Sequence, residues 1–124
     1  MATGSAIILS NDEQTVSVCS GCLNDTGIDL VVTAEFDGFI LALQENDYDV
    51  IICDCSNNFE KCLQWVKIIK KMRPKVALIV ISQEIKKNTG GVLYQEGIFH
   101  LTEKPLDKEY LREILKAIII PGKM

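Results

Sequence analysis

Asp54 has the strongest chemical signature in this chain, because a carboxylate directly follows a run of apolar residues. The run at residues 50–53 reads Val-Ile-Ile-Cys, which is typical of a strand buried on both faces. Burying an isolated carboxylate is costly unless a cation or hydrogen-bond donors compensate its charge. We therefore expect Asp54 at the carboxyl end of this strand, where open parallel sheets bind their ligands.

Four other polar residues lie close after apolar runs elsewhere in the chain. Asn11 and Asp12 come after the first such run, Ser82 after the fourth and Lys104 after the fifth. If these runs are parallel strands of one sheet, their carboxyl ends share an edge. The side chains are then expected to meet Asp54 at that edge.

Two carboxylates, a hydroxyl and an ammonium at one edge suit phosphoryl chemistry. Asp12 and Asp54 repel each other unless a cation lies between them, and carboxylate oxygens are ligands that suit Mg²⁺. The backbone carbonyl of Ser56 is a further candidate ligand. With Asp54 as the nucleophile, the cation, Lys104 and Ser82 can each bind a phosphoryl oxygen.

Five strands and five helices are expected to position these residues, and they alternate along the chain. The strands are predicted at 6–9, 29–33, 50–54, 76–81 and 98–101. The helices are predicted at 13–24, from about 38 to the turn at 46–49, and at 59–72, 85–96 and 108–119. This alternation indicates an α/β fold with a three-layer, doubly wound, five-stranded parallel sheet of flavodoxin-like order 2-1-3-4-5. In that order the loops after the first and third strands are neighbours.

The helix predicted at 85–96 has the weakest pattern of the five. Gly90 and Gly91 interrupt it. Each glycine costs about 1 kcal/mol relative to alanine in a helix interior. We therefore expect this helix to be the most mobile.

The composition indicates one globular domain and argues against several other classes. The 124 residues suit a single domain over residues 1–124, and 48% of them are hydrophobic. The net charge of −4 argues against nucleic-acid contact by this domain. No apolar run approaches the ~20 residues that cross a membrane, and the first residues do not resemble a secretory signal. We therefore expect no membrane contact and a cytoplasmic location.

The cysteines are expected to be reduced thiols. There are five of them, an odd number, and most fall in predicted core positions: Cys19, Cys22, Cys53, Cys55 and Cys62. The spacings Cys19-x-x-Cys22 and Cys53-x-Cys55 leave a metal–thiolate site open. Because Cys19 and Cys22 fall within a predicted helix, we favour small apolar side chains in or near the core.

These motifs, in this order and spacing, resemble the receiver domain of two-component response regulators over essentially the whole chain. The resemblance covers a stand-alone receiver and one that belongs to a longer regulator. It is carried by Ser10-Asn11-Asp12-Glu13, residues 34–43, Asp49 to Asp54, residues 79–82 and Glu103-Lys104-Pro105 after Gly97.

The resemblance implies a signalling role for the edge residues. Asp54 accepts a phosphoryl group from a histidine kinase or histidine phosphotransferase, and Lys104 pairs with that group. Ser82 is the switch hydroxyl, and the bond Lys104-Pro105 is cis. The domain is a phosphoacceptor rather than an enzyme, catalysing at most its own phosphoryl transfer and dephosphorylation. Its output is a protein–protein face formed by the fourth helix, fifth strand and fifth helix, which contacts an output protein or a second copy.

The resemblance also implies the cofactor Mg²⁺. Its ligands are the carboxylates of Asp12 and Asp54 and the backbone carbonyl of Ser56. Asn11 stands where the family has a second acidic residue and contributes indirectly. The loss of that charge is expected to weaken Mg²⁺ binding without abolishing it.

Other positions depart from the family pattern. Asn57-Asn58 replace the usual Met-Pro after the phosphoacceptor. Gln83 stands where the family usually has a small residue and is bulky enough to crowd the phosphoryl site. Leu101 takes the position of the switch aromatic, so its coupling to Ser82 is expected to be changed or absent.

These departures favour one alternative function. In that alternative the domain is a phosphorylation-independent pseudo-receiver, a protein-interaction module, as Asn11, Gln83 and Leu101 suggest. A flavin or nucleotide site on the same fold is disfavoured. It requires a phosphate cradle after the first strand, and residues 10–13 are acidic there.

Overall fold

The computed structural model describes residues 4–55, 58–86 and 88–119, and it contains one five-stranded sheet. The strands are β1 (Ser5–Leu9), β2 (Asp29–Thr33), β3 (Val50–Asp54), β4 (Ala77–Ser82) and β5 (His100–Glu103). All paired strands are parallel, and their order is β2-β1-β3-β4-β5, which confirms the predicted fold class. Among the described residues, no helix is both long and apolar enough to cross a membrane.

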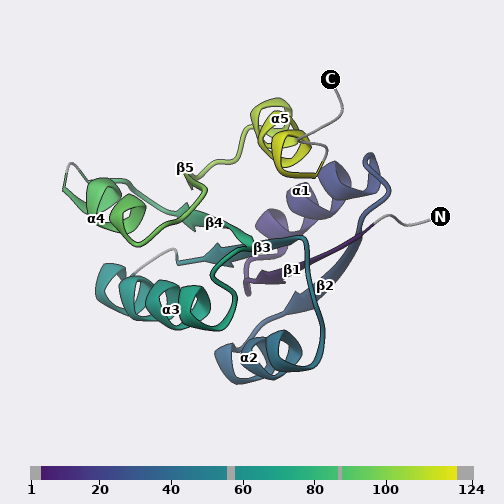
Figure 1. Cartoon of the computed structure of the whole chain (residues 1–124). Helices are drawn as coiled ribbons and strands as arrows, with labels where there is room; N and C mark the ends of the chain where they lie inside the picture. The colour runs from purple at the N-terminus through teal and green to yellow at the C-terminus, as the bar shows by residue number, and fades with distance from the viewer. Residues whose placement is uncertain (1–3, 56–57, 87, 120–124) are drawn as a thin grey trace.

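Helices cover both faces of the sheet. They are α1 (Glu13–Asn24), α2 (Phe36–Glu45), α3 (Phe59–Met72), α4 (Thr89–Gln95) and α5 (Lys108–Ile119). α1 and α5 pack on one face, and α2, α3 and α4 lie on the other (Figure 1). The sheet between two helical layers is the expected three-layer arrangement.

Alternating side chains of the central strands divide the core into two parts. Ile51 and Cys53 of β3 pack on the face of α2 and α3, whereas Ile52 packs on the face of α1 and α5. All three are fully buried. Because both faces of β3 are buried, its sequence is continuously apolar until Asp54, where the strand reaches the edge of the sheet.

Local sequence explains where the helices beside the site begin. Asp12 caps α1 by accepting a hydrogen bond from the backbone nitrogen of Gln14 at 3.1 Å. Asn58 caps α3 by accepting one from the backbone nitrogen of Lys61 at 3.0 Å. After α1, Gly27 adopts a φ of 75°, a left-handed conformation that glycine tolerates best.

Several elements differ from their predicted bounds: β1, β4 and α2 by one or two residues, β5 by two at each end, and α4 by four at its start. α4 begins at Thr89 rather than 85, and the backbone nitrogen of Ile85, which precedes the helix, donates to a carboxylate oxygen of Glu103 at 2.9 Å. β5 begins at His100 rather than 98, although Phe99 already donates a backbone hydrogen bond to Leu78 at 2.8 Å.

A matched pair of leucines on α2 tests this account of the core. Leu43 is fully buried, whereas Leu41 is 56% exposed. Leu43→Ala is expected to lower the free energy of unfolding by about 2–5 kcal/mol, because it leaves a cavity against the sheet. Leu41→Ala should change it by less than about 0.5 kcal/mol. Urea denaturation measures both, and equal losses would contradict the packing described here.

Candidate functional site

Lys104 joins the two acidic residues at the carboxyl edge of the sheet. Its Nζ lies 2.7 Å from Oδ2 of Asp12 and 3.0 Å from Oδ2 of Asp54. The side chain of Asp54 is only 3% exposed, and that of Lys104 is 14% exposed. The ammonium therefore provides the positive charge that a nearly buried carboxylate requires. The bond Lys104-Pro105 is cis, as the sequence resemblance implied.

Ser10 is a further member of the site that the sequence analysis missed. Its hydroxyl donates to Oδ2 of Asp54 at 2.7 Å and accepts from the backbone nitrogen of Asp12 at 3.1 Å. Ser10 is buried at the end of β1. A hydroxyl directly after the first strand could have indicated a site residue. Ser10 also lies just before a predicted helix, where a hydroxyl commonly serves as a cap.

The contacts at this edge shift two pKa values. Hydrogen bonds from Lys104 and from the hydroxyl of Thr15 lower the pKa of Asp12 to about 2. For Lys104, burial alone would lower the pKa, but the hydrogen bonds to Asp12 and Asp54 outweigh it and raise the pKa. Each shift favours the charged form, so these interactions hold the ion pair together.

A cavity of about 290 Å³ opens beside Asp54. It is lined by Asn11, Asp54, Cys55, Asn58, Lys61, Cys62 and Trp65. The ring of Trp65 stacks on Phe36 with centroids 4.9 Å apart, and Nζ of Lys61 lies 5.4 Å from its centre. Asn11 therefore lies beside Asp54, as predicted from the strand order. Ser56, the predicted backbone ligand, lies outside the described residues.

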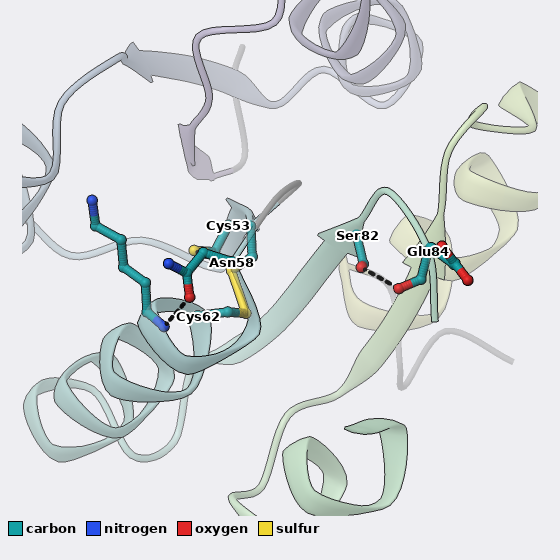
Figure 2. The surroundings of a disulfide bond; sticks show 7 residues. Cys53, Asn58, Cys62, Ser82 and Glu84 are labelled. Carbon is teal, nitrogen blue, oxygen red and sulfur yellow. Dashed lines mark hydrogen bonds between the residues drawn. A yellow bond between two sulfur atoms is a disulfide. The ribbon is translucent and has the colours of Figure 1, made fainter. Parts of the chain in front are cut away.

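The hydroxyl of Ser82 makes a hydrogen bond within its own loop. It donates to the backbone carbonyl of Glu84 at 3.0 Å (Figure 2). Ser82 lines a second cavity, of about 250 Å³, together with Leu101, Cys55 and Cys62. The structure therefore brings Lys104 into contact with Asp12 and Asp54, and the switch role of Ser82 remains a prediction.

Gln83 and Leu101, two of the residues that depart from the family pattern, line cavities near the site. Gln83 lines the cavity of Ser82 and also a third cavity, of about 300 Å³, beside Asp12 and Lys104. Leu101 is buried, and its backbone nitrogen donates to the hydroxyl of Tyr94 at 2.9 Å. Gln83 is therefore placed next to the ion pair, whereas Leu101 is part of the core beneath α4.

The prediction that the cysteines are reduced thiols is wrong for one pair. Cys55 and Cys62 form a disulfide, and their Cα atoms lie 5.2 Å apart (Figure 2). The end of β3 and the first turn of α3 bring the two residues within the range of disulfide geometry, which the linear spacing did not reveal.

Cys19, Cys22 and Cys53 are thiols in the core, as favoured from the sequence. Burial raises the pKa of Cys19 to about 12 and raises the pKa of Cys22 and Cys53 as well. Their thiols are therefore poor nucleophiles and poor metal ligands at neutral pH.

The donor set fits a magnesium ion held by few protein ligands. Asp12 and Asp54 provide two carboxylates at one edge, and Asn11 adds an amide beside Asp54. Mg²⁺ in proteins uses one or two carboxylates and keeps several waters. Within residues 4–55, 58–86 and 88–119, no cluster of three or more His, Cys, Asp or Glu residues could hold a metal ion. The oxygen ligands that suit Mg²⁺ at this edge are therefore the two carboxylates of Asp12 and Asp54 and the amide of Asn11.

A five-stranded parallel sheet of this order, with an acidic pair and a lysine at its carboxyl edge, is a receiver-like fold. Residues 6–116 match the response regulator receiver domain family. The chain therefore belongs to this family, and the resemblance seen in the sequence is confirmed. A search of curated proteins by sequence gave no match.

Solved structures show the same fold at low sequence identity. A response regulator from Thermotoga maritima is 19% identical with a TM-score of 0.87, and the match covers 95% of this chain and 98% of that one. An orphan response regulator of H. pylori is 16% identical with a TM-score of 0.84 over the same shares. The receiver domain of the sensor histidine kinase PA1611 from Pseudomonas aeruginosa, with magnesium coordinated in its active-site cleft, is 17% identical with a TM-score of 0.77, again over 95% and 98%.

The pKa of Asp12 tests the ion pair directly. In Lys104→Met the carboxyl of Asp12 is expected to titrate well above 2 and nearer its ordinary 3.8, because the largest cause of the shift is removed. Carbon-detected NMR of the side-chain carboxyl measures this midpoint. Lys61→Met is the matched control, since Lys61 lines the neighbouring cavity and its ammonium lies over the ring of Trp65, and it should leave the midpoint unchanged.

The same shift predicts how stability depends on pH. Because the folded-state pKa of Asp12 lies below 3.8, the charged carboxyl stabilises the fold above that pH. This stabilisation is lost as the pH falls towards about 2. The stability difference between wild type and Lys104→Met should therefore shrink over this window, and a constant difference would contradict the ion pair.

Proposed function

We propose that this domain, spanning residues 1–124, is a two-component phosphoacceptor that receives a phosphoryl group on Asp54 in the cytoplasm. The observation that carries the proposal is the contact of Lys104 with both Asp12 and Asp54 at the open edge of the sheet. Together with the family membership, this contact favours a site for a transferred anion over a purely structural ion pair. The phosphoryl donor is a histidine kinase or a histidine phosphotransferase.

The transfer follows from the positions of these groups. A carboxylate oxygen of Asp54 forms the new bond to phosphorus while the bond from phosphorus to the donor's leaving atom breaks and that atom keeps the electron pair. Lys104 neutralises charge on the phosphoryl oxygens. Asp12 and Asp54 are the described residues that would hold Mg²⁺, with the backbone of Ser56 as a further proposed ligand. When bound, Mg²⁺ supplies further neutralisation of phosphoryl charge.

The phosphoryl group then changes a protein–protein face. The hydroxyl of Ser82, which donates a hydrogen bond to the backbone carbonyl of Glu84, is proposed to turn towards the phosphoryl group. The face is formed by α4, β5 and α5, which carry exposed apolar side chains at Val92, Tyr94 and Tyr110. These side chains support an output protein or a second copy of the domain as the partner. The domain acts as a signalling phosphoacceptor and catalyses at most its own transfer and dephosphorylation.

Intact mass after treatment with Mg²⁺ and acetyl phosphate tests the acceptor. The wild type is expected to gain the mass of one phosphoryl group, and Asp54→Ala should gain none because the nucleophile is absent. Asp29→Ala is the matched control, since Asp29 is exposed at the start of β2, at the opposite edge of the sheet, and it should be modified like the wild type. Chelation of Mg²⁺ should suppress the reaction in the wild type.

One alternative function is a phosphorylation-independent interaction module. Gln83 lies beside the ion pair, and the hydroxyl of Ser82 is hydrogen-bonded to the backbone of Glu84. A wild type that stays unmodified would contradict the phosphoacceptor and favour that alternative, and an adduct that persists in Asp54→Ala would contradict Asp54 as the acceptor.

Gln83 offers a second test of the proposed site. Gln83→Ala is expected to raise the rate of phosphorylation by acetyl phosphate several-fold, because the side chain lines the cavity beside Asp12 and Lys104. The exposed neighbour Glu84 supplies the control, since Glu84→Ala keeps the backbone carbonyl that Ser82 bonds and should leave the rate unchanged. A slower Gln83→Ala would contradict the view that this residue crowds the site.

A further inference from the structure

Three sulfur atoms gather directly beside Asp54. Cys55 follows the phosphoacceptor in the chain and is bonded to Cys62 in the first turn of α3. The Sγ atom of Cys53, the residue before Asp54, lies 3.5 Å from that of Cys55. The phosphoacceptor is therefore flanked by two cysteines, one of which is covalently tied to the next helix.

The bridged segment forms the wall of the cavity beside Asp54. Of the seven described residues that line this cavity, five fall between 55 and 65, and two of these are the bridged cysteines. The same two cysteines also line the cavity of Ser82. The disulfide therefore belongs to the wall of both cavities, and reagents that enter either one approach its sulfur atoms.

We propose that Cys55 and Cys62 form a reversible dithiol–disulfide site that controls how readily Asp54 accepts a phosphoryl group. The role of Asp54 in this inference rests on the proposed function. The phosphoryl transfer proposed above takes place in the cytoplasm, where disulfides are typically transient and redox-sensing. Cys53 stays a thiol, because it is fully buried on β3 and its thiolate is disfavoured there.

The chemistry of the site is ordinary thiol–disulfide exchange. One thiol of a dithiol reductant attacks one sulfur of the bridge, which releases the other cysteine and leaves a mixed disulfide. The second thiol of the reductant then attacks this mixed disulfide and releases the remaining cysteine. The protein gains two electrons and two protons, and the reductant leaves as its own disulfide. In the reverse direction the two thiols lose two electrons and two protons to hydrogen peroxide, which is reduced to two molecules of water.

The bridge is expected to speed phosphorylation. It closes a loop between residues seven apart and so restricts the segment that shapes the cavity beside Asp54. If the residues that line the cavity are held in fixed positions, they keep the phosphoryl donor close to Asp54 without a further loss of conformational entropy. Reduction frees this segment, and the reduced protein should accept a phosphoryl group several-fold more slowly than the oxidised one.

The first measurement counts thiols in the full chain. Wild type is treated with hydrogen peroxide or with dithiothreitol, the reagent is removed, and free thiols are alkylated under denaturing conditions. The oxidised protein should carry three alkyl groups, on Cys19, Cys22 and Cys53, and the reduced protein five. Peptide mapping should find Cys55 linked to Cys62. Five alkyl groups after peroxide, or a link through Cys53, would overturn the proposal.

The second measurement compares phosphorylation rates in the two states with acetyl phosphate and Mg²⁺. Cys62→Ser cannot form the bridge and should react at the reduced rate under both treatments. Cys19→Ser is the matched control, because Cys19 is a buried thiol on the opposite face of the sheet, and it should keep the redox response of the wild type. Equal rates for oxidised and reduced wild type would overturn the proposal.

Fluorescence of Trp65 separates this inference from the proposed function. Trp65 is the only tryptophan and lines the cavity that the bridge shapes, so its emission should differ between the oxidised and reduced wild type. An absence of phosphorylation in both states, with the emission change present, would reject the phosphoacceptor but keep the redox site. An unchanged emission would reject control of the cavity by the bridge.

Discussion

The ion pair between Lys104 and the two aspartates is the interaction on which the site depends. Asp54 is nearly buried, and a carboxylate in that position is stable only with a close positive charge and hydrogen-bond donors. Lys104 and Ser10 supply them from the ends of β5 and β1. β4 separates β5 from β3, so the long lysine stem must cross it, and the backbone of Lys104 is anchored to Ser82 at 2.9 Å. The observed strand order places all three charges at one edge of the sheet.

The same charges explain why the proposed phosphoryl transfer would require a cation. Two carboxylates and one ammonium leave an excess of negative charge, which a further anion would increase. A divalent cation beside Asp12 and Asp54 reverses that balance, and the two carboxylates supply the oxygen ligands it prefers. Because Asn11 is uncharged, the excess of negative charge is smaller here than in a site with a third acidic residue. The substitution weakens the attraction for a cation and also lowers the repulsion that an incoming phosphoryl group meets.

Much of the fold was predictable because local signals and burial agreed. Asp12 and Asn58 mark the starts of α1 and α3, and the central strands are continuously apolar because both faces are covered. The start of α4 was not predictable from the local pattern, because Gly90 and Gly91 interrupt it and Asn88 makes no side-chain cap hydrogen bond. The disulfide and the role of Ser10 escaped prediction because both arise where separate elements meet.

The disulfide and the ion pair of this domain meet at the end of β3, in the segment that leads into α3. The carboxylate of Asp54 ends the strand, and the next residue is covalently tied to the helix that follows. Leu101 lies on the far side of this segment, in the cavity of Ser82, and offers neither a ring nor a hydroxyl to report on the phosphoryl site. The end of β3 reaches that cavity in two ways, through the bridge that lines both cavities and through its pairing with β4, which carries Ser82. The backbone pairing and the covalent bridge therefore both connect the surroundings of Asp54 to residues of α4 and β5 that line the cavity of Ser82.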